Sequence, residues 1–280
     1  MTLTSRTFGL LSAFTRENPS MRLGQLADAA GLPLTTTHRI VADLLACGAL
    51  ERDASGSLHV GLRLWEIGSL APRGHTLREV ALPFLEDLYV ATRENVQLAV
   101  REGLESVFVE RLTGREAVTV MTRVGARFPL PSTGVGRALL AHAPADVQEQ
   151  ALAQPVRRWT ERTETDPARL RAVLAEVHRT GVAISDREVT DDAVSVAAPV
   201  RGPGREVVAA VSLVVRSGTA STAALVPAVR AAALGVSRSL GAPPSAGRKN
   251  GWRATAVPDH PHPTRARTRR AAESTSGEPP

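Results

Sequence analysis

The sequence contains a single cysteine among its 280 residues. One cysteine can form neither an intrachain disulfide nor a cysteine-rich metal site. Cys47 lies near the end of a predicted helix, on its apolar side, and we interpret it as a small core residue. No run of about 18 apolar residues is present, which argues against a membrane-spanning helix. The N-terminus, MTLTSRTF, lacks the apolar centre of a signal peptide, so we expect a cytoplasmic protein.

The short motifs of common catalytic centres are also missing. The chain has no G-x-S-x-G elbow, no G-x-x-x-x-G-K-[ST] loop and no H-E-x-x-H pair. His75 and His142 have no second ligand at a useful helical spacing, so we interpret both as solvated surface histidines. We therefore predict no catalytic residue, no metal and no cofactor.

Positive charge is concentrated at one end of the chain. The formal net charge is +6 and the isoelectric point is about 10.9, values that suggest a nucleic-acid partner. Residues 241–280 carry seven basic and three acidic side chains, which leaves the rest of the chain nearly balanced. The prediction of DNA binding must therefore rest on a motif rather than on overall charge.

That motif is LGQLADAAGLPLTTTHRIVADLLAC, residues 23–47, which predicts two helices joined by a tight turn. Gly31 interrupts the helical spacing of apolar residues, because such a turn needs a residue that tolerates positive φ. Each helix has an apolar stripe. That of the first helix consists of Leu23, Leu26, Ala27 and Ala30, and that of the second consists of Ile40, Val41, Leu44 and Leu45. An ordinary pair of antiparallel helices is the alternative interpretation.

The first turns of the second helix are the predicted DNA-reading surface, because a recognition helix presents its N-terminal side chains to base edges. A threonine-rich start also suits N-capping and phosphate contacts. Gln25, in the first helix of the motif, and Arg6, upstream of it, are further candidates for contacts with DNA. The reading residues are expected to be Thr35, Thr36, Thr37, His38 and Arg39.

A β-hairpin is predicted directly after this unit, over residues 48–60, where small residues separate two short strands. A hairpin in this place is a wing, and Arg52 is its best candidate for a phosphate contact, with a solvated charge as the alternative. Upstream, residues 4–16 predict a supporting helix with Phe8, Leu11 and Phe14 on one face. Arg16 is left free to face phosphate or solvent.

The remaining chain predicts a mixed α/β domain followed by a tail. Residues 62–70 and 75–94 indicate two helices, the second with Pro83 inside. Alternating patterns predict strands and helical patterns predict helices. The strands are 96–103, 106–112, 117–125, 182–187, 194–201 and 206–216, and the helices are 134–143, 166–180 and 219–240. We divide the chain into residues 1–61, linker helices 62–94, a domain at 95–241 and a disordered basic tail at 242–280.

Several segments together resemble the isocitrate-lyase-regulator (IclR) family of bacterial transcription regulators. They are the helix-turn-helix sequence through ALERD, GLRLWEIG, RVGARFPLPSTGVGRALLA, GVAISDREV and VSVAAPV. The resemblance extends from about Arg6 to Gly241, and its motifs are specific in combination. It implies an α+β fold: an N-terminal winged helix-turn-helix domain and a C-terminal GAF/PAS-like domain that binds a small effector. It also implies a homodimer or homotetramer that binds an operator in double-stranded DNA.

The resemblance further implies where an effector would bind. Gly134 and Val135 open a helix, and unpaired N–H groups at a helix start favour a carboxylate, although an ordinary helix start is the alternative. The family pattern adds polar positions on neighbouring strands: Ser185, Asp186, Ser195 and Ser212.

The chain departs from the family pattern at three of its usual pocket positions. Serine replaces an acidic residue at Ser185, Val214 replaces a serine, and Asp192-Ala193 replaces a glycine. One wall is therefore less polar, which favours a ligand with an anionic end and an apolar body. The candidates to line the apolar side are Phe128, Leu130 and Met121, with an ordinary place in the core as the alternative for each.

The sequence thus predicts a transcription regulator whose operator binding is modulated by a small carboxylate-bearing or aromatic effector. Two alternatives stay open: an enzyme that uses the second domain as its active site, and a small-molecule-binding module whose helical domain serves only for docking. Salt-sensitive binding to duplex DNA distinguishes the regulator from the binding module, and turnover of a candidate ligand would indicate the enzyme.

Overall fold

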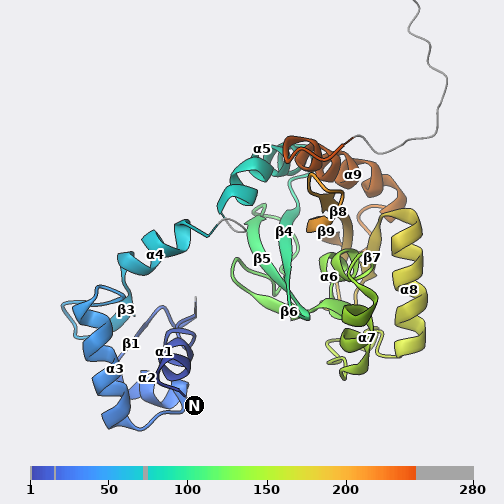
Figure 1. Ribbon diagram of the computed structural model, residues 1–280. Helices are drawn as coiled ribbons and strands as arrows, with labels where there is room; N and C mark the ends of the chain where they lie inside the picture. The colour runs from blue at the N-terminus through green and yellow to red at the C-terminus, as the bar shows by residue number, and fades with distance from the viewer. Residues whose placement is uncertain (1, 16, 72–74, 244–280) are drawn as a thin grey trace, which may run out of the picture. The chain divides into compact units, whose positions relative to one another are not determined.

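The N-terminal part of the chain folds as three helices and a small sheet (Figure 1). The computed structural model describes residues 2–15, 17–71 and 75–243. The sheet has the order β1-β3-β2, and both pairings are antiparallel. Its elements are α1 (Leu3–Leu11), β1 (Ser20–Met21), α2 (Leu23–Ala30), α3 (Leu34–Ala46), β2 (Leu50–Arg52) and β3 (Leu58–Val60).

The helix-turn-helix prediction is confirmed. Gly31 ends α2 with a φ of 62°, the left-handed conformation that favours glycine, and its N–H bonds back to Ala27 and Asp28. The predicted apolar stripes meet in one core, which includes Leu26, Ile40, Val41 and Leu44. The predicted hairpin is β2 and β3, and β1 adds a third strand that the sequence pattern did not predict.

Three local predictions in this part are wrong. Helix α1 ends at Leu11, and its buried residue is Leu10, while Phe8 is 66% exposed. Cys47 is the exposed C-cap of α3 rather than a core residue, because Leu44 and Leu45 already supply the apolar side there. The N-cap of α3 is Pro33, which makes no side-chain cap, so no threonine caps this helix.

The C-terminal part is built around one six-stranded antiparallel sheet with the order β6-β5-β4-β9-β8-β7. Helix α4 (Leu62–Ser69) precedes it, as predicted. The strands are β4 (Asn95–Glu102), β5 (Glu105–Leu112), β6 (Arg127–Pro129), β7 (Ala183–Asp186), β8 (Ala193–Arg201) and β9 (Val207–Arg216). The helices are α5 (His75–Thr92), α6 (Gly134–Leu140), α7 (Ala145–Ala153), α8 (Pro167–Thr180) and α9 (Thr222–Ser239).

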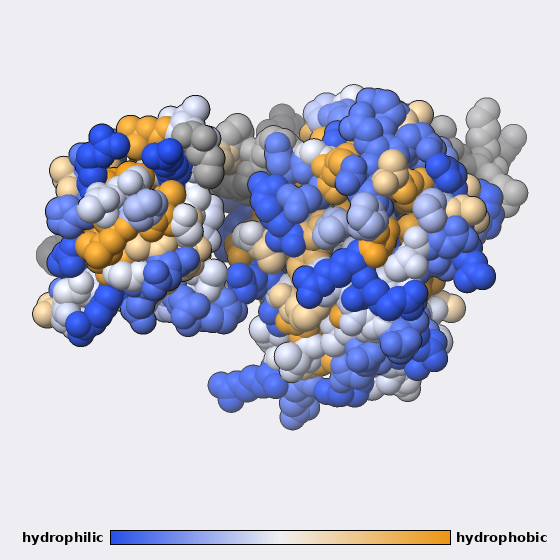
Figure 2. Space-filling view, turned by 90° about the horizontal axis from the view of Figure 1, so that it is seen from below, coloured by the Kyte–Doolittle hydropathy of each residue, from blue (hydrophilic) through white to orange (hydrophobic). Residues whose placement is uncertain are grey.

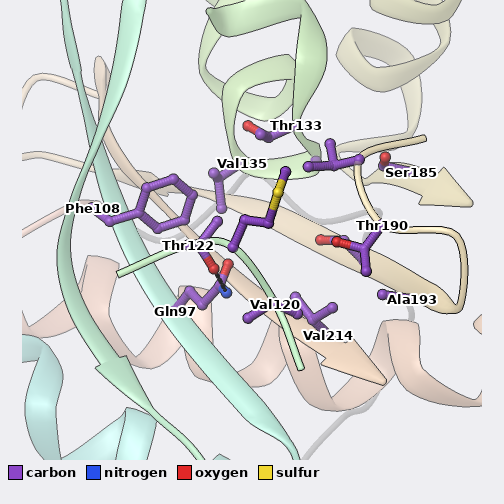
Figure 3. Close-up of a pocket in the computed structure, with 14 residues that line it drawn as sticks. Gln97, Phe108, Val120, Thr122, Thr133, Val135, Ser185, Thr190, Ala193 and Val214 are labelled. Carbon is purple, nitrogen blue, oxygen red and sulfur yellow. Dashed lines mark hydrogen bonds between the residues drawn. The ribbon is translucent and has the colours of Figure 1, made fainter. Parts of the chain in front are cut away.

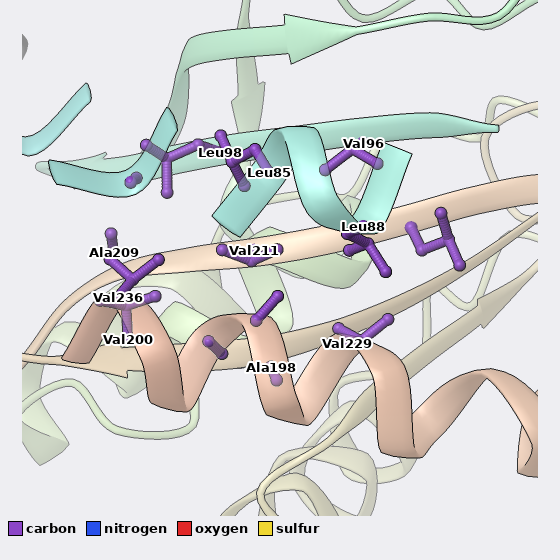
Figure 4. Close-up of a cluster of buried hydrophobic side chains, with 14 of the residues drawn as sticks. Leu85, Leu88, Val96, Leu98, Ala198, Val200, Ala209, Val211, Val229 and Val236 are labelled. Atoms are coloured by element: carbon purple, nitrogen blue, oxygen red, sulfur yellow. The ribbon is translucent and has the colours of Figure 1, made fainter. Parts of the chain in front are cut away.

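Alternation along the strands gives the sheet two buried faces. One face packs against α5 and α9 through side chains such as Leu98, Val211 and Val229, as Figure 4 shows. The neighbouring positions, Ala99 and Ala210 among them, face α6, α7 and α8. Both faces are covered by helices, so polar side chains at inward positions are the exception. Those exceptions mark the candidate site.

The predicted strand at 117–125 is wrong. The segment from Thr113 to Ala126 is irregular and is held by side chains of the sheet. Asn95 Nδ2 donates to the Val118 carbonyl oxygen at 2.8 Å, and Arg111 Nη1 donates to that of Thr122 at 2.7 Å. The alternation of apolar residues in this segment reflects packing against the sheet rather than a strand, because Val118 and Val120 pack on Val214 and Ala193. We call residues 113–126 the strap.

Other elements were not predicted: α7, β6 and a 3-10 turn over Leu130–Ser132. In the part that the structure describes, no helix is long and apolar enough to cross a membrane. The predicted disorder of residues 242–280 concerns a segment that, from Pro244 onward, lies outside the described residues.

Candidate functional site

The first candidate surface is the N-terminal half of α3. Thr35, His38 and Arg39 are exposed there, and Thr36 is partly exposed. Thr37 is fully buried, and its hydroxyl donates to the Pro33 carbonyl oxygen at 3.1 Å. The prediction that Thr37 reads DNA is therefore wrong: the helical turn that points Thr35 and Arg39 outward directs Thr37 into the core.

The wing presents Arg52 beside its turn. Arg52 is exposed, and its Nη1 donates to the Gly56 carbonyl oxygen at 2.9 Å. Asp53 organises the same turn by accepting from the Ser55 hydroxyl and from the N–H groups of Ser55 and Ser57. The hydroxyl of Ser55 is the main reason why the pKa of Asp53 is lowered. The turn is thus prearranged with a cation at its base.

The two remaining candidates have different settings. Gln25 is exposed, but its Oε1 accepts the Arg22 N–H at 2.9 Å and so helps to cap α2. Arg6 is partly buried on α1. Arg16 lies outside the described residues. Residues 1–61 contain five arginines and five carboxylates and so carry no net charge. Any attraction of this part to DNA must therefore come from where the arginines are placed.

The second candidate site is a pocket in the C-terminal part, between the sheet, the start of α6 and the strap (Figure 3). It contains about 440 Å³ of space between atoms, part of which is open to solvent. Its lining combines hydroxyl, amide and apolar groups: Gln97, Phe108, Val120, Met121, Thr122, Thr133, Gly134, Val135, Ser185, Val189, Thr190, Ala193, Ser195 and Val214.

Strand register brings the polar residues of the sheet together. Ser185 is paired with Ser195, and Ser195 with Val214, while Ser212 is paired with Gln97 in the next row. These side chains share one face because the period of a strand is two. Asp186, one residue after Ser185, is on the other side of its strand.

The start of α6 forms another wall. Thr133 is its N-cap, and the Thr133 hydroxyl accepts the Gly136 N–H at 3.0 Å. A Cβ added to Gly134 would lie 2.8 Å from the Ser195 hydroxyl, so the missing side chain is what lets this serine approach the helix. Gly134, Val135 and Ser195 therefore surround the same space.

Five predicted residues line the pocket and four do not. Those that line it are Gly134, Val135, Ser185, Ser195 and Met121. The others are placed elsewhere, and the lining does not include Phe128, Leu130, Ser212 or Asp186.

The reasons for these four placements differ. Phe128 and Leu130 are packed in the core beneath α6, where Phe128 meets Phe108 and Trp159. Ser212 is buried behind Gln97, and its hydroxyl donates to Gln97 Oε1 at 3.2 Å. Asp186 pairs with Arg187, and that hydrogen bond is the main cause of its lowered pKa.

The sequence did not predict Gln97, Phe108, Thr122 or Thr190. Gln97 could have been found as a polar residue at an inward-facing position of a predicted strand. Which side chains lie next to it, however, depends on the strand register, which the sequence does not show. Thr122 reaches the pocket only because the strap is irregular.

The prediction of a solvated His142 is wrong. Its ring stacks on His178 with 5.0 Å between centroids, and Nδ1 lies 3.0 Å from the Ala138 carbonyl oxygen. Burial is the main cause of the lowered pKa of His142. Among the described residues, no group of three or more His, Cys, Asp or Glu side chains could hold a metal ion.

Comparisons with known proteins assign both parts of the chain to one family. The sequence matches the IclR helix-turn-helix domain over residues 4–54 and the family described as "Bacterial transcriptional regulator IclR C-terminal" over residues 71–238. The chain belongs to the IclR family. Its IclR-type fold therefore combines a helix-turn-helix domain with a mixed α/β domain, as predicted, and such proteins are transcription regulators rather than enzymes.

Individual IclR-family relatives cover most of the chain. The HTH-type transcriptional regulator KipR of Bacillus subtilis is 31% identical over 84% of this chain and 96% of its own length. The glycerol operon regulatory protein of Streptomyces coelicolor is 32% identical, over 79% and 89% respectively. An IclR homolog from Microbacterium hydrocarbonoxydans, solved as a complex with 4-hydroxybenzoate, is 36% identical, covering 85% of this chain and 99% of that one, with a TM-score of 0.79.

Proposed function

We propose that this IclR-family regulator reads a DNA operator through α3 and the wing, and that a small acid in the pocket modulates this binding. Residues 1–61 would contact DNA, residues 95–241 would bind the effector, and the helices within 62–94 would join them. The observation that carries the proposal is the pocket lining, in which hydroxyls and the glycine start of α6 adjoin apolar side chains.

The pocket favours one negative charge and an apolar body. The hydroxyls of Thr133, Ser185 and Ser195 and the N–H groups of Gly134 and Val135 supply donors for a carboxylate at one end. Phe108 and Val120 supply apolar surface. The relative solved with 4-hydroxybenzoate, a small aromatic acid, supports the same ligand class. Asp186 and Ser212, which do not line the pocket, would contribute only indirectly.

On the DNA side, the proposed base-reading residues are Thr35, Thr36, His38 and Arg39. Arg52 would contact a phosphate next to them, while Gln25 and Arg6 would contribute from α2 and α1. Ligand binding would shift the population of DNA-binding-competent arrangements. Such a regulator would act in the cytoplasm, where its operator and effector meet.

The test uses fluorescence anisotropy with the full chain. A labelled duplex from the region upstream of its own gene is compared with a scrambled duplex across a salt series, because phosphate contacts make affinity fall steeply with salt. We expect preference for the first duplex, and a changed affinity on addition of 4-hydroxybenzoate. Equal binding to both duplexes, insensitive to every acid tested, would contradict the proposal.

We further propose that the protein is a homo-oligomer held in part by α4. This helix exposes Leu62, Trp65 and Ile67, and large apolar side chains gathered on a surface commonly mark an interaction site. Hydrophobic residues reach the surface of the N-terminal part in Figure 2. The exposed apolar residues of α1, of α4 and just after α4 are Leu3, Phe8, Leu62, Trp65, Ile67 and Leu70.

Light scattering after size exclusion tests the oligomer. Trp65→Asp places a charge on a side chain that is 68% exposed, and we expect it to lower the molar mass. Leu234→Asp, on α9 and 50% exposed, is the matched control. Dissociation by Leu234→Asp but not by Trp65→Asp would move the interface away from α4.

A further inference from the structure

The pocket has hydrogen-bonding groups at two sides rather than one. Figure 3 shows Thr133 and Ser185 along one side and Gln97 and Thr122 along the other, with Val135 and Phe108 between. The first side is the proposed carboxylate end. The second side has no role in the proposed function, and it is built around a single buried amide.

Gln97 is fixed in an unusual setting for a polar side chain. It is 2% exposed on β4, Nε2 donates to the Thr122 hydroxyl, and Oε1 accepts from Ser212. A primary amide has two N–H donors and two oxygen lone pairs. Each amide atom therefore keeps one hydrogen-bonding position beyond the contacts made by these two residues, and Gln97 lines the pocket.

Neighbouring contacts hold the amide in place. Ser212 is fully buried on the strand next to β4, so it fixes the Gln97 oxygen from behind. Thr122 belongs to the strap, and its carbonyl oxygen accepts from Arg111 Nη1 at 2.7 Å. A side chain restrained on both sides loses little entropy when a ligand binds, which favours recognition.

We infer that Gln97 selects effectors by a second polar group at the end of the ligand opposite the carboxylate. This inference rests on the proposed function of the pocket. None of the lining residues, all of them in the described part of the chain, is charged. A second carboxylate at Gln97 would find one amide N–H and one hydroxyl, with neither a cation nor the backbone N–H groups that the start of α6 supplies at the other end, so its burial would be unfavourable. The selected group is therefore neutral, such as a hydroxyl.

Calorimetric titration of the full chain with three probes tests this inference. The probes are 4-hydroxybenzoate, benzoate and benzene-1,4-dicarboxylate, which differ only at the position opposite the carboxylate. One additional hydrogen bond to a restrained amide corresponds to a preference of about 2- to 12-fold. We expect 4-hydroxybenzoate to bind more tightly than benzoate by this factor, and the dicarboxylate to bind most weakly.

Two variants assign the preference to Gln97. Gln97→Met keeps the length of the side chain without hydrogen-bonding groups, and Gln97→Asn keeps the amide but withdraws it by one methylene. Both should bring the ratio of the two affinities close to one. Ser106→Ala is the matched control, since Ser106 is equally buried but bonds to Phe128 outside the pocket lining. It should retain the wild-type ratio.

The outcomes separate this inference from the proposed function. Equal affinity of the wild type for 4-hydroxybenzoate and benzoate, or an unchanged ratio in Gln97→Met and Gln97→Asn, would overturn the role of Gln97 and leave the effector class intact. If none of the three acids bound, the proposed effector class would be wrong, and this inference with it.

Discussion

Arg137 and Glu188 form an ion pair in which the arginine side chain is 2% exposed and the glutamate side chain 13% exposed. Both terminal guanidinium nitrogens donate to the carboxylate, Nη1 at 2.6 Å, and Nε donates to the Pro131 carbonyl oxygen at 2.8 Å. Arg137 lies in α6 two residues after Val135, and Glu188 directly precedes Val189. The pair therefore joins two walls of the pocket.

Breaking this pair should destabilise the fold strongly. Glu188→Gln leaves the buried Arg137 without a counter-charge, and such changes typically cost about 3–5 kcal/mol in the free energy of unfolding. Denaturant titration measures the loss. The exposed pair of Arg171 and Glu149, also joined by two hydrogen bonds, is the control, and Glu149→Gln should change stability little.

A double replacement tests whether charge or packing matters at this position. Arg137→Met combined with Glu188→Leu removes both charges, and we expect it to be more stable than Glu188→Gln alone. If the single and double variants were equally destabilised, the loss would come from packing rather than from an unpaired charge.

Two glycines of α6 should respond differently to alanine. Alanine is normally favoured over glycine within a helix by about 1 kcal/mol. At Gly136, however, a Cβ would lie 2.2 Å from the Leu130 carbonyl oxygen, which is backbone and cannot rotate away. We expect Gly136→Ala to destabilise the protein by about 1–3 kcal/mol, as overpacking does.

At Gly134 the neighbouring atom is the Ser195 hydroxyl, which can change rotamer. Gly134→Ala should therefore fold but narrow the pocket and weaken 4-hydroxybenzoate binding. Thermal unfolding and calorimetric titration measure the two effects. Unchanged affinity in a folded Gly134→Ala variant would argue against a ligand next to α6.

Acidification should destabilise the protein through His142. Burial, with smaller contributions from Arg201 and His178, lowers its pKa in the folded state, while the hydrogen bond with Ala138 opposes the shift. A depressed pKa means that the unfolded chain binds the proton more readily. The contribution to stability is complete above the unfolded pKa of about 6.5 and is lost as the pH falls below it.

The measurement is the free energy of unfolding between pH 7.5 and 5. His142→Gln should show a shallower decline with acid than the wild type, whereas His38→Gln, on the exposed face of α3, should decline as the wild type does. Parallel curves for wild type and His142→Gln would contradict the assignment.

Two residues of α3 should separate DNA reading from core packing. If Arg39 reads a guanine, Arg39→Ala should weaken operator binding by about 1–3 kcal/mol. Thr37→Val preserves the shape of a fully buried side chain, so DNA affinity should stay unchanged, with a loss of stability of at most about 1.5 kcal/mol for one hydrogen bond. Fluorescence anisotropy at one salt concentration compares the DNA affinities of the two variants. A loss of affinity in Thr37→Val but not in Arg39→Ala would refute the assignment of Arg39 to DNA reading and Thr37 to the core.

The sequence alone determined the elements that depend on neighbours along the chain. The turn at Gly31, the α3 helix and the α8 helix follow from local periodicity and backbone preference. These signals depend only on residues close together in the chain, so they can be recognised without knowledge of the fold. The same local signals predicted that Gly134 and Val135 begin a helix.

Only the tertiary structure decided which of these residues meet. The strap has the alternation of a strand, but it forms none: side chains of the sheet, Asn95 and Arg111, donate to the carbonyl oxygens of Val118 and Thr122. Phe128 packs in the core, whereas Gln97 reaches the pocket because strand register places it beside Ser212. Register and packing join residues distant in sequence, and a one-residue shift would move each side chain to the opposite face.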